Sequence, residues 1–397
     1  MHVRIAHVTP YFQPQLGYEE HYLTREQKRA GNEVCIITSD RYFSFPDYKD
    51  SVEHILGSRK VGTGLFNVDG VSVYRLPCLY EWGAAIVVYG MKRALKIFAP
   101  DVVHAHYMLY PSSILASLNK SMGFKLVVDQ HMINDDQPRS PWKFFAYRIY
   151  KRLAFQLLSR RVDRFIALTP AVLRWLQEEF NVDSRSITLV PLGADASFFR
   201  RDEQFRAQYR NLLHLSDDEL LVTYAGKLLP EKDIDVLIKG VAPLIEEYGK
   251  MKVLLLGSGS KRYVSEILAL AKSHNIAESL ILHDLVDRGE LVKFYNASDV
   301  GVWLGRPSIT IIEAMSCGLP VVLAKSLQTC HLLAYDNGFS FSPGDPNEFK
   351  MCLERLVEDE NLRLSMGQRS RKLVEEKLNW CVIAKKTLDI YREVLSN

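Results

Sequence analysis

The stretch RPSITIIEAMSCGLPVVL, Arg306–Leu323, decides the fold of this chain. Pro307 has a fixed φ that suits the first turn of a helix, and the hydroxyl of Ser308 can cap or flank that turn. Apolar residues follow at helical spacing until Gly318 stops the helix, and Pro320 prevents its continuation. The apolar run after this proline therefore predicts a buried strand.

Glu313 is a carboxylate inside this apolar helix. Ile309 and Thr310 lie four and three residues earlier, so they share its face of the helix. The free N–H groups of the first turn, at Ser308 and Ile309, can bind a phosphate together with the helix dipole. The carboxylate one turn later can accept hydrogen bonds from a sugar hydroxyl, so the segment fits a nucleotide sugar. The alternative is an amphipathic helix whose Glu313 faces water.

Bulk composition limits the classes of protein that this chain can belong to. A length of 397 residues predicts two domains, and a net charge of +3 gives no reason to expect nucleic acid as a partner. The six cysteines lack CxxC spacing and are expected to be reduced, buried thiols in a cytosolic protein. We see no leader sequence and no apolar run of about 18 residues, so any membrane contact is expected to be peripheral.

The order of predicted elements is that of an α/β protein. Strand Val3–Val8, a helix from about Tyr18 to Gly31 and strand Val34–Thr38 form a βαβ start, which implies a parallel sheet. Residues 40–70 are expected to be mostly loop, and residues 84–98 a helix. Alternation resumes after a polar stretch, 197–218. We predict two doubly wound parallel-sheet domains, residues 1–200 and 201–381, which face each other across a cleft, with a last helix at about 382–397 that packs on the first domain.

Three positions of the N-terminal half lie where open α/β sheets bind ligands. His106 and His131 each follow the carboxyl end of a predicted strand. Gly17 stands at a loop-to-helix junction, where backbone can approach a ligand closely. The alternatives are hydrogen-bonded structural histidines and a helix-entry turn without a ligand.

Loops of the C-terminal half carry cations and glycines after strand ends. Lys227, next to Gly226, and Lys232 surround the start of a helix that Asp233 can cap, and this arrangement fits a diphosphate. The alternative is two solvated loop lysines. Gly257 opens a further glycine turn, GSGS, after the next strand.

Together these residues resemble the retaining glycosyltransferases of the GT-B fold, of the group 1 type classed as family 4, over nearly the whole chain. The matching motifs are the glycine loop at Gly17, Tyr18 and Glu19, the strand Asp101–His106, His131, the turn Pro191, Gly193 and Asp195, the phosphate motif Gly226-Lys227 with Glu231-Lys232, and the EAMxCGxPVV motif Glu313–Val322. Two positions depart from the family pattern. Lys227 stands where the family usually has arginine, and Gly305 stands where it has the first glutamate of E-x7-E.

The resemblance implies a metal-independent, cofactor-free hexosyltransferase that uses a nucleoside-diphosphate sugar. Lys227 and Lys232 would neutralise the leaving diphosphate, Glu313 would hold the ribose, and His131 with the Gly17 loop would meet the sugar. Tyr18 and His106 are expected on the sugar or acceptor side, and the acceptor is a hydroxyl, for example of a lipid-linked glycan. Gly305 keeps two alternatives open, a non-catalytic nucleotide-sugar binding protein and a nucleotide-sugar epimerase.

The segment Trp142–Arg161 has six cations, no acidic residue and apolar residues at helical spacing. Such a helix can lie on an anionic membrane surface, at the cytoplasmic face for a cytosolic protein. The alternative is a helix that packs its apolar face on the sheet and points its cations at water.

Overall fold

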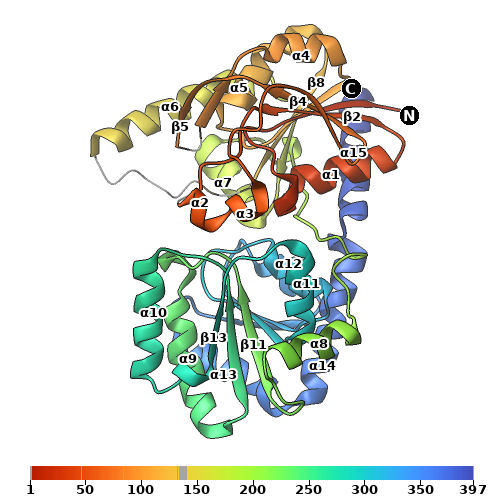
Figure 1. Ribbon diagram of the computed structural model, residues 1–397. Helices are drawn as coiled ribbons and strands as arrows, with labels where there is room; N and C mark the ends of the chain where they lie inside the picture. The colour runs from red at the N-terminus through yellow and green to blue at the C-terminus, as the bar shows by residue number, and fades with distance from the viewer. Residues whose placement is uncertain (1, 46, 84, 132, 134–140, 397) are drawn as a thin grey trace. The chain divides into compact units, whose positions relative to one another are not determined.

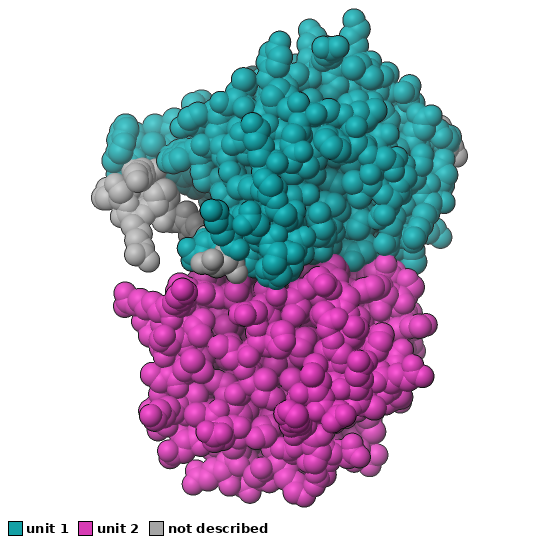
Figure 2. Space-filling model, in the orientation of Figure 1, with its two compact units in different colours: residues 1–191, 380–397 teal, residues 192–379 magenta. Residues whose placement is uncertain are grey.

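The computed structural model describes residues 2–45, 47–83, 85–131, 133 and 141–396. The chain folds into two compact units, residues 1–191 with 380–397 (unit 1) and residues 192–379 (unit 2), coloured in Figure 2. Unit 1 thus contains both ends of the chain. The sequence pattern predicts the boundaries after residues 200 and 381 instead, because the polar stretch after Pro191 resembles a linker. Its apolar members, such as Phe199, belong to the core of unit 2.

Unit 1 is built on an eight-stranded sheet of order β10-β9-β8-β7-β1-β2-β4-β3 (Figure 1). All neighbouring strands pair in parallel except β3 and β4, which are antiparallel. The bounds are β1 Arg4–Val8, β2 Glu33–Ser39, β3 Gly64–Val68, β4 Val71–Leu76, β7 Val102–Ala105, β8 Lys125–Gln130, β9 Arg164–Ala167 and β10 Ile187–Leu189. The central strands are buried along almost their whole length, as in a parallel sheet covered by helices on both faces.

The helices of unit 1 come from both ends of the chain. They are α1 Glu19–Arg29, the short α2 Tyr48–Ser51 and α3 Glu53–Leu56, α4 Met91–Phe98, α5 Pro111–Leu118, α6 Pro141–Ser159, α7 Pro170–Phe180 and α15 Trp380–Ser396. The C-terminal α15 packs against α1, where the rings of Tyr22 and Trp380 stack with centroids 5.8 Å apart. Among the described residues, no helix is both long enough and apolar enough to span a bilayer.

Two segments of unit 1 differ from the sequence-based expectation. Residues 40–70 contain α2, α3 and the edge strand β3 as well as loop. Residues 84–98 are not one helix, because β6 Ala85–Val88 pairs with β5 Cys78–Trp82 in a separate two-stranded sheet. The run AIVV favours a strand, and Gly90, with φ of +96°, separates that strand from α4.

Unit 2 is built on a six-stranded parallel sheet of order β13-β12-β11-β14-β15-β16 (Figure 1). The strands are β11 Leu220–Ala225, β12 Met251–Leu256, β13 Leu280–His283, β14 Val300–Trp303, β15 Val321–Ala324 and β16 Gly338–Phe341. The helices are α8 Glu203–Leu212, α9 Ile234–Tyr248, α10 Lys261–Ser273, α11 Arg288–Ala297, α12 Thr310–Ser316, α13 Pro346–Glu358 and α14 Glu360–Leu373. The predicted pair of doubly wound α/β domains is therefore confirmed.

The cysteines only partly match the expectation of buried thiols. Among the described residues, which include all six cysteines, there is no disulfide bond. Cys35 and Cys317 are buried, whereas Cys330 and Cys381 are exposed. Burial is thus the wrong expectation for those two residues, which lie at the surface of their elements.

Candidate functional site

Two loops of unit 2 touch backbone to backbone after β11 and β12. A Cβ on Gly257 would lie 1.9 Å from the carbonyl oxygen of Gly226, and a Cβ on Gly259 would lie 2.2 Å from that of Leu228. The N–H of Leu228 donates to the carbonyl of Ser258 over 2.8 Å. Since no side chain fits at these contacts, the glycines are needed for two loops to form one continuous surface.

Gly305 brings the loop after β14 to the same place. A Cβ on Gly305 would lie 2.3 Å from the carbonyl oxygen of Glu231 and 2.9 Å from Cα of Lys232. The N–H of the next residue, Arg306, donates to the same Glu231 carbonyl over 3.1 Å. A glutamate at position 305 would therefore displace the loop after β11, which gives a physical reason for this departure from the family pattern.

Lys232 is a fixed cation where these loops meet. Its side chain is 9% exposed, and Nζ donates to the carbonyl oxygens of Arg306 at 2.6 Å and Pro307 at 3.4 Å. Burial, with a smaller contribution from the charge of Arg306, lowers the pKa of Lys232 to about 8. The alternative of a solvated loop lysine is thus wrong for Lys232.

Lys227 lies on the same loop but is exposed. Surrounding protein atoms lower the pKa of its ammonium, and the nearby carboxylate of Glu231 opposes that shift. The hydroxyl of Tyr224 donates to the carbonyl of Lys227 over 2.9 Å, which fixes the backbone of the loop. The two lysines thus differ in exposure, because Lys232 is buried and Lys227 lies at the surface.

Helix α12 begins later than predicted, at Thr310, and Ser308 does not cap it. The position before it, Ile309, has helical angles (φ −59°, ψ −26°) and no side-chain cap. The hydroxyl of Thr310 donates to the carbonyl of Ala225 over 2.8 Å and accepts from Nε1 of Trp303 over 3.1 Å. Thr310 therefore ties the helix to the ends of β11 and β14, and its side chain is not offered to a ligand. Ser308 and Ile309 stay half-buried in the preceding turn.

Glu313 is fully buried and does not face water. One carboxylate oxygen pairs with the guanidinium of Arg288, which packs over the ring of Phe199 with Cζ 4.8 Å from its centroid. The other oxygen, Oε2, has no hydrogen-bond partner among the described residues. Burial raises the pKa of Glu313, while Arg288 opposes that shift. A buried carboxylate with one uncommitted oxygen is suited to accept hydrogen bonds from a ligand hydroxyl.

His131 is the half-buried end of a charged cluster in unit 1. Its Nε2 lies 2.8 Å from Oε2 of Glu19 on α1 and 3.3 Å from Oδ1 of Asp129 on β8. Its ring stacks on that of Tyr107, with centroids 4.3 Å apart. Burial alone would lower the pKa of His131, but the two carboxylates outweigh it and raise the pKa well above 6.5. The two carboxylates therefore favour the imidazolium form of His131.

The loop before α1 brings Glu19 to this histidine. Gly17 ends a short 3-10 turn, Pro14–Leu16, with a left-handed backbone (φ +62°, ψ +44°) that favours glycine. Tyr18 follows as the residue before α1, half-buried and extended, and makes no side-chain cap. The glycine thus turns the chain so that the first helical residue, Glu19, lies beside His131.

His106 has no ring nitrogen left for a ligand, because its side chain is fully buried and its two nitrogens face Asp129 and His7. Its Nδ1 lies 2.5 Å from Oδ2 of Asp129. The expectation that His106 lies on the sugar or acceptor side is corrected, since the structural alternative describes it better. It is a partner of the carboxylate that faces His131.

Two groups of side chains in the described part of unit 1 bring possible metal-ligand atoms within 4.8 Å of one another. They are His7, His104 and His106, and Glu19, His106, Asp129 and His131. That the protein requires no metal ion stays a prediction.

Two family models match the chain. The model described as "Glycosyltransferase Family 4" matches residues 21–198, and the one described as "Glycosyl transferases group 1" matches residues 205–373. The chain is 24% identical over 412 residues to an uncharacterized glycosyltransferase of Methanocaldococcus jannaschii, covering 98% of both chains. It is 28% identical over 267 residues to a D-inositol 3-phosphate glycosyltransferase of Kineococcus radiotolerans, covering 61% of this chain and 60% of the relative.

Solved structures resemble both units together. Sucrose-phosphate synthase of Thermosynechococcus elongatus superposes with a TM-score of 0.75 at 19% identity, covering 99% of each chain. HepE of Anabaena, in complex with UDP and glucose, superposes with a TM-score of 0.74 at 17% identity, covering 99% of this chain and all of the other. The chain has the GT-B glycosyltransferase fold. It carries a family 4 glycosyltransferase domain followed by a group 1 domain.

Sequence reasoning missed several residues of this GT-B glycosyltransferase. Arg288 lies 25 positions before its partner Glu313 and has no motif of its own. Asp129 stands two residues before His131 at the carboxyl end of its strand, and that position could have been read as a polar site residue. Tyr391 lies in the last helix, and nothing local connects it to the N-terminal strands.

Proposed function

We propose that this GT-B chain transfers a sugar from a nucleoside-diphosphate sugar to an acceptor hydroxyl, with retention of anomeric configuration and without a metal. The observation that carries the proposal is the fixed cation Lys232, at the meeting of the loops that follow β11 and β14 and beside the exposed Lys227. A diphosphate is the group on such a donor that needs cations. The buried carboxylate of Glu313 then takes the ribose hydroxyls.

The proposed reaction needs no protein nucleophile. The bond from the anomeric carbon to the diphosphate oxygen breaks while a bond to the acceptor oxygen forms on the same face, and a diphosphate oxygen takes the acceptor proton. Lys227, Lys232 and the main-chain N–H groups of Ser308 and Ile309 stabilise the charge on the leaving diphosphate. His131, as an imidazolium, donates a hydrogen bond to a hydroxyl of the transferred sugar, and the Gly17 loop lies beside it.

One experiment distinguishes this proposal from its alternatives. The protein is incubated with UDP-, GDP- and ADP-sugars and candidate acceptors, and free nucleoside diphosphate and sugar products are both followed. Acceptor-dependent release of the diphosphate supports transfer. Binding without release favours a non-catalytic binding protein, and a changed nucleotide sugar without release favours an epimerase. No binding of any nucleotide sugar would overturn the proposal.

We further propose that unit 1 binds an anionic membrane surface through α6, which fits a lipid-linked acceptor. The side chains of one stripe of this helix are exposed, namely Trp142 72%, Phe145 59%, Ile149 44%, Leu153 55% and Leu157 45%. The helix contacts the rest of unit 1 with a different stripe, which includes Tyr150, Ala154 and Leu158. Ala154 and Leu158 are buried, and the Tyr150 hydroxyl donates to the Leu109 carbonyl over 2.6 Å.

The cations of α6 do not all contribute to that surface. Lys151 pairs with Glu179 at 2.8 Å and lies over the ring of Trp175. Arg148 and Arg152 are exposed on the helix. The side chains of Lys143 and Phe144 lie outside the described residues. An apolar stripe beside arginines, with no acidic residue in the helix, matches a bilayer with anionic headgroups.

A further inference from the structure

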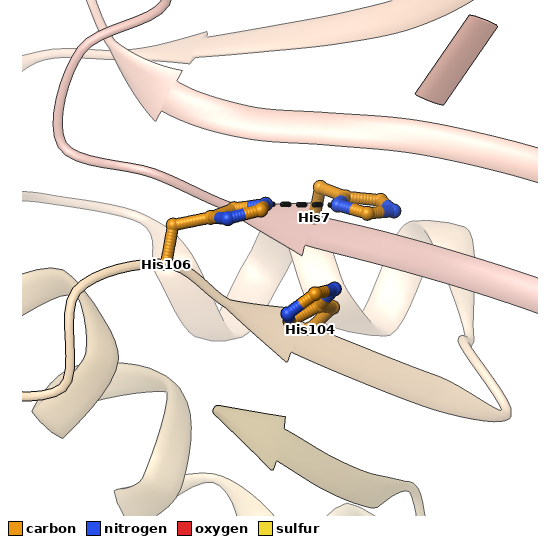
Figure 3. Close-up of side chains that lie close together, drawn as sticks. All are labelled: His7, His104 and His106. Carbon is orange, nitrogen blue, oxygen red and sulfur yellow. Dashed lines mark hydrogen bonds between the residues drawn. The ribbon is translucent and has the colours of Figure 1, made fainter. Parts of the chain in front are cut away.

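Three buried histidines lie on one face of the sheet of unit 1. His7 on β1 is the register partner of His104 on β7, and His106 follows two residues later, so all three side chains point the same way. Each is at most 1% exposed. Figure 3 shows His7 and His106 joined by a hydrogen bond, with His104 beside them. Nδ1 of His7 lies 2.9 Å from Nε2 of His106.

Two helices from opposite ends of the chain close over these histidines. Oε1 of Gln27, on α1, lies 2.7 Å from Nε2 of His7. Nε2 of the same glutamine donates to the hydroxyl of Tyr391, on α15, over 3.2 Å. That hydroxyl lies 2.6 Å from Nδ1 of His104. Gln27 therefore connects His7 directly, and His104 through Tyr391, in one hydrogen-bonded network.

Asp129 lies beside both His106 and His104 and so closes this network into a circle of six side chains, His7, Gln27, Tyr391, His104, Asp129 and His106. Its Oδ2 lies 2.5 Å from Nδ1 of His106 and 3.2 Å from Nε2 of His104, the latter not aligned for a good hydrogen bond. Its other oxygen, Oδ1, accepts the N–H of Tyr107 over 3.1 Å and faces His131. Tyr107 holds a left-handed backbone, φ +66°, that side chains rarely adopt. Contacts with His106 and with the backbone N–H of Tyr107 thus fix the orientation of the Asp129 carboxylate.

With the carbonyl of Gln27 toward His7 and its amide toward Tyr391, the protons around the circle are assigned as follows. The carbonyl of Gln27 accepts from Nε2 of His7, so a neutral His7 must accept at Nδ1 from Nε2 of His106. His106 also donates from Nδ1 to Asp129, and it is therefore doubly protonated. The amide of Gln27 donates to Tyr391, whose single proton goes to Nδ1 of His104. The proton of His104 then lies on Nε2, toward Asp129.

The surroundings of each histidine agree with this assignment. Burial lowers the pKa of His7 and of His104, so both are neutral. Burial opposes protonation of His106 as well, but Asp129 outweighs it and raises the pKa. The charges of His106 and His131 hold the pKa of Asp129 well below its usual range, against its burial. In this assignment, none of the three imidazoles of His7, His104 and His106 has a free lone pair for a metal ion.

We propose that this ring of six side chains makes Tyr391 a positioning residue for His131. The ring holds Asp129 ionised and oriented, with Oδ1 turned to the imidazolium of His131, and Tyr391 supplies the proton that directs His104 toward the same carboxylate. The C-terminal helix thereby helps to position His131. The protonation pattern is independent of the proposed function, whereas the effect on turnover rests on it.

The first test is the ¹⁵N spectrum of the imidazoles in the ¹⁵N-histidine-labelled protein. The expected result is a doubly protonated His106 and Nε2–H tautomers of His7 and His104, all unchanged from pH 6 to 8. A neutral His106 or an Nδ1–H tautomer of His7 would overturn the assignment. So would stoichiometric zinc in the purified protein together with a shift of these signals on chelation, which would favour a metal site instead.

The second test compares Tyr391→Phe with Ile390→Val, a conservative change of a buried neighbour on the same helix. Tyr391→Phe should change the His104 signals and lower kcat/KM about tenfold, the scale of a slightly misplaced catalytic group, with unchanged Kd for the nucleoside diphosphate. Ile390→Val should leave the His104 signals, kcat/KM and the Kd for the nucleoside diphosphate unchanged. Signals of His104 and His131 that do not move in Tyr391→Phe would overturn the proposal, whereas a wild type without turnover would contradict only the proposed function.

Discussion

At the scale of single residues, the charge of Lys232 should set the pH range of ligand binding. A lysine with a pKa of about 8 loses its charge as the pH rises through that value, and a bound anion favours the charged form. The affinity for a nucleoside diphosphate should therefore fall as the pH rises above 8. Calorimetric titrations between pH 6.5 and 9.5 measure this dependence.

A matched pair of variants separates this lysine from others on the surface. Lys232→Met should remove the pH dependence and slow transfer by roughly 10²–10³, the scale for loss of one transition-state contact. Lys239→Met, on α9, removes an exposed lysine that pairs with Asp235 at 2.7 Å, and it should behave as wild type. Equal pH profiles of wild type and Lys232→Met would contradict the diphosphate contact.

Glu313 offers one oxygen to a ligand and uses the other for Arg288. Glu313→Gln keeps the shape of the side chain but weakens hydrogen bonds from ribose hydroxyls, so affinity for the nucleoside diphosphate should fall by about 1–3 kcal/mol. The circular dichroism spectrum should stay the same. Affinity equal to that of wild type in calorimetry would show that the uncommitted oxygen does not bind the nucleotide.

His131 should give the pH profile of kcat/KM an alkaline limb, that is, a fall in kcat/KM at high pH. Its pKa is well above 6.5 because Glu19 and Asp129 outweigh burial, and Glu20, His106 and Tyr107 are the other titratable groups around it. As the pH rises through this pKa the imidazolium loses its proton, and kcat/KM should fall. Glu19→Gln removes one carboxylate and should move the limb to lower pH. If kcat/KM of Glu19→Gln falls at the same pH as that of the wild type, His131 is excluded as the group responsible for the fall.

At the scale of elements, the sequence predicts best what its local signals determine. Gly318 and Pro320 stop one element and force the next, so β15 lies where it was expected. The start of α12 could not be predicted, because contacts of Thr310 with distant strand ends override the local preference of Pro307. The pairing of Arg288 with Glu313 depends likewise on tertiary packing. The candidate site was therefore predictable at its loops and not at its buried partners.

Helix α6 is a second element whose surroundings depend on tertiary packing. Helical spacing alone predicts an apolar stripe, but only the fold shows that this stripe is exposed. Arg148→Glu with Arg152→Glu should weaken binding to anionic vesicles by at least about 30-fold, from roughly 1 kcal/mol for each lost cation. Ile149→Ser with Leu153→Ser should weaken binding to the same vesicles at high salt as well. Co-sedimentation with phosphatidylserine-containing vesicles measures both effects.

The control for α6 is an equal change of charge in unit 2. Lys261 and Lys272 are exposed on α10, so Lys261→Glu with Lys272→Glu alters net charge by the same amount. This variant should sediment like the wild type, and neither protein should bind vesicles of neutral lipid. Equal sedimentation of the α6 variants and the control would indicate a soluble acceptor and no membrane contact of this helix.

At the scale of the whole molecule, each unit has its own hydrophobic core, and helix α15 belongs to unit 1. Trp380, 1% exposed, stacks on Tyr22, so the end of the chain contributes to the stability of its beginning. Trp380→Ala should lower the unfolding free energy of unit 1 by roughly 3–5 kcal/mol. Phe349→Ala, a fully buried residue of α13, should act on unit 2 by a similar amount.

Ligand then distinguishes the two units in one unfolding experiment. A nucleoside diphosphate that binds unit 2 at 100 times its Kd should stabilise that unit by about 2.7 kcal/mol. In calorimetric scans we expect two transitions, one lowered by Trp380→Ala and unaffected by nucleotide, the other lowered by Phe349→Ala and raised by nucleotide. A single transition that both variants lower and nucleotide raises would mean that the units unfold together.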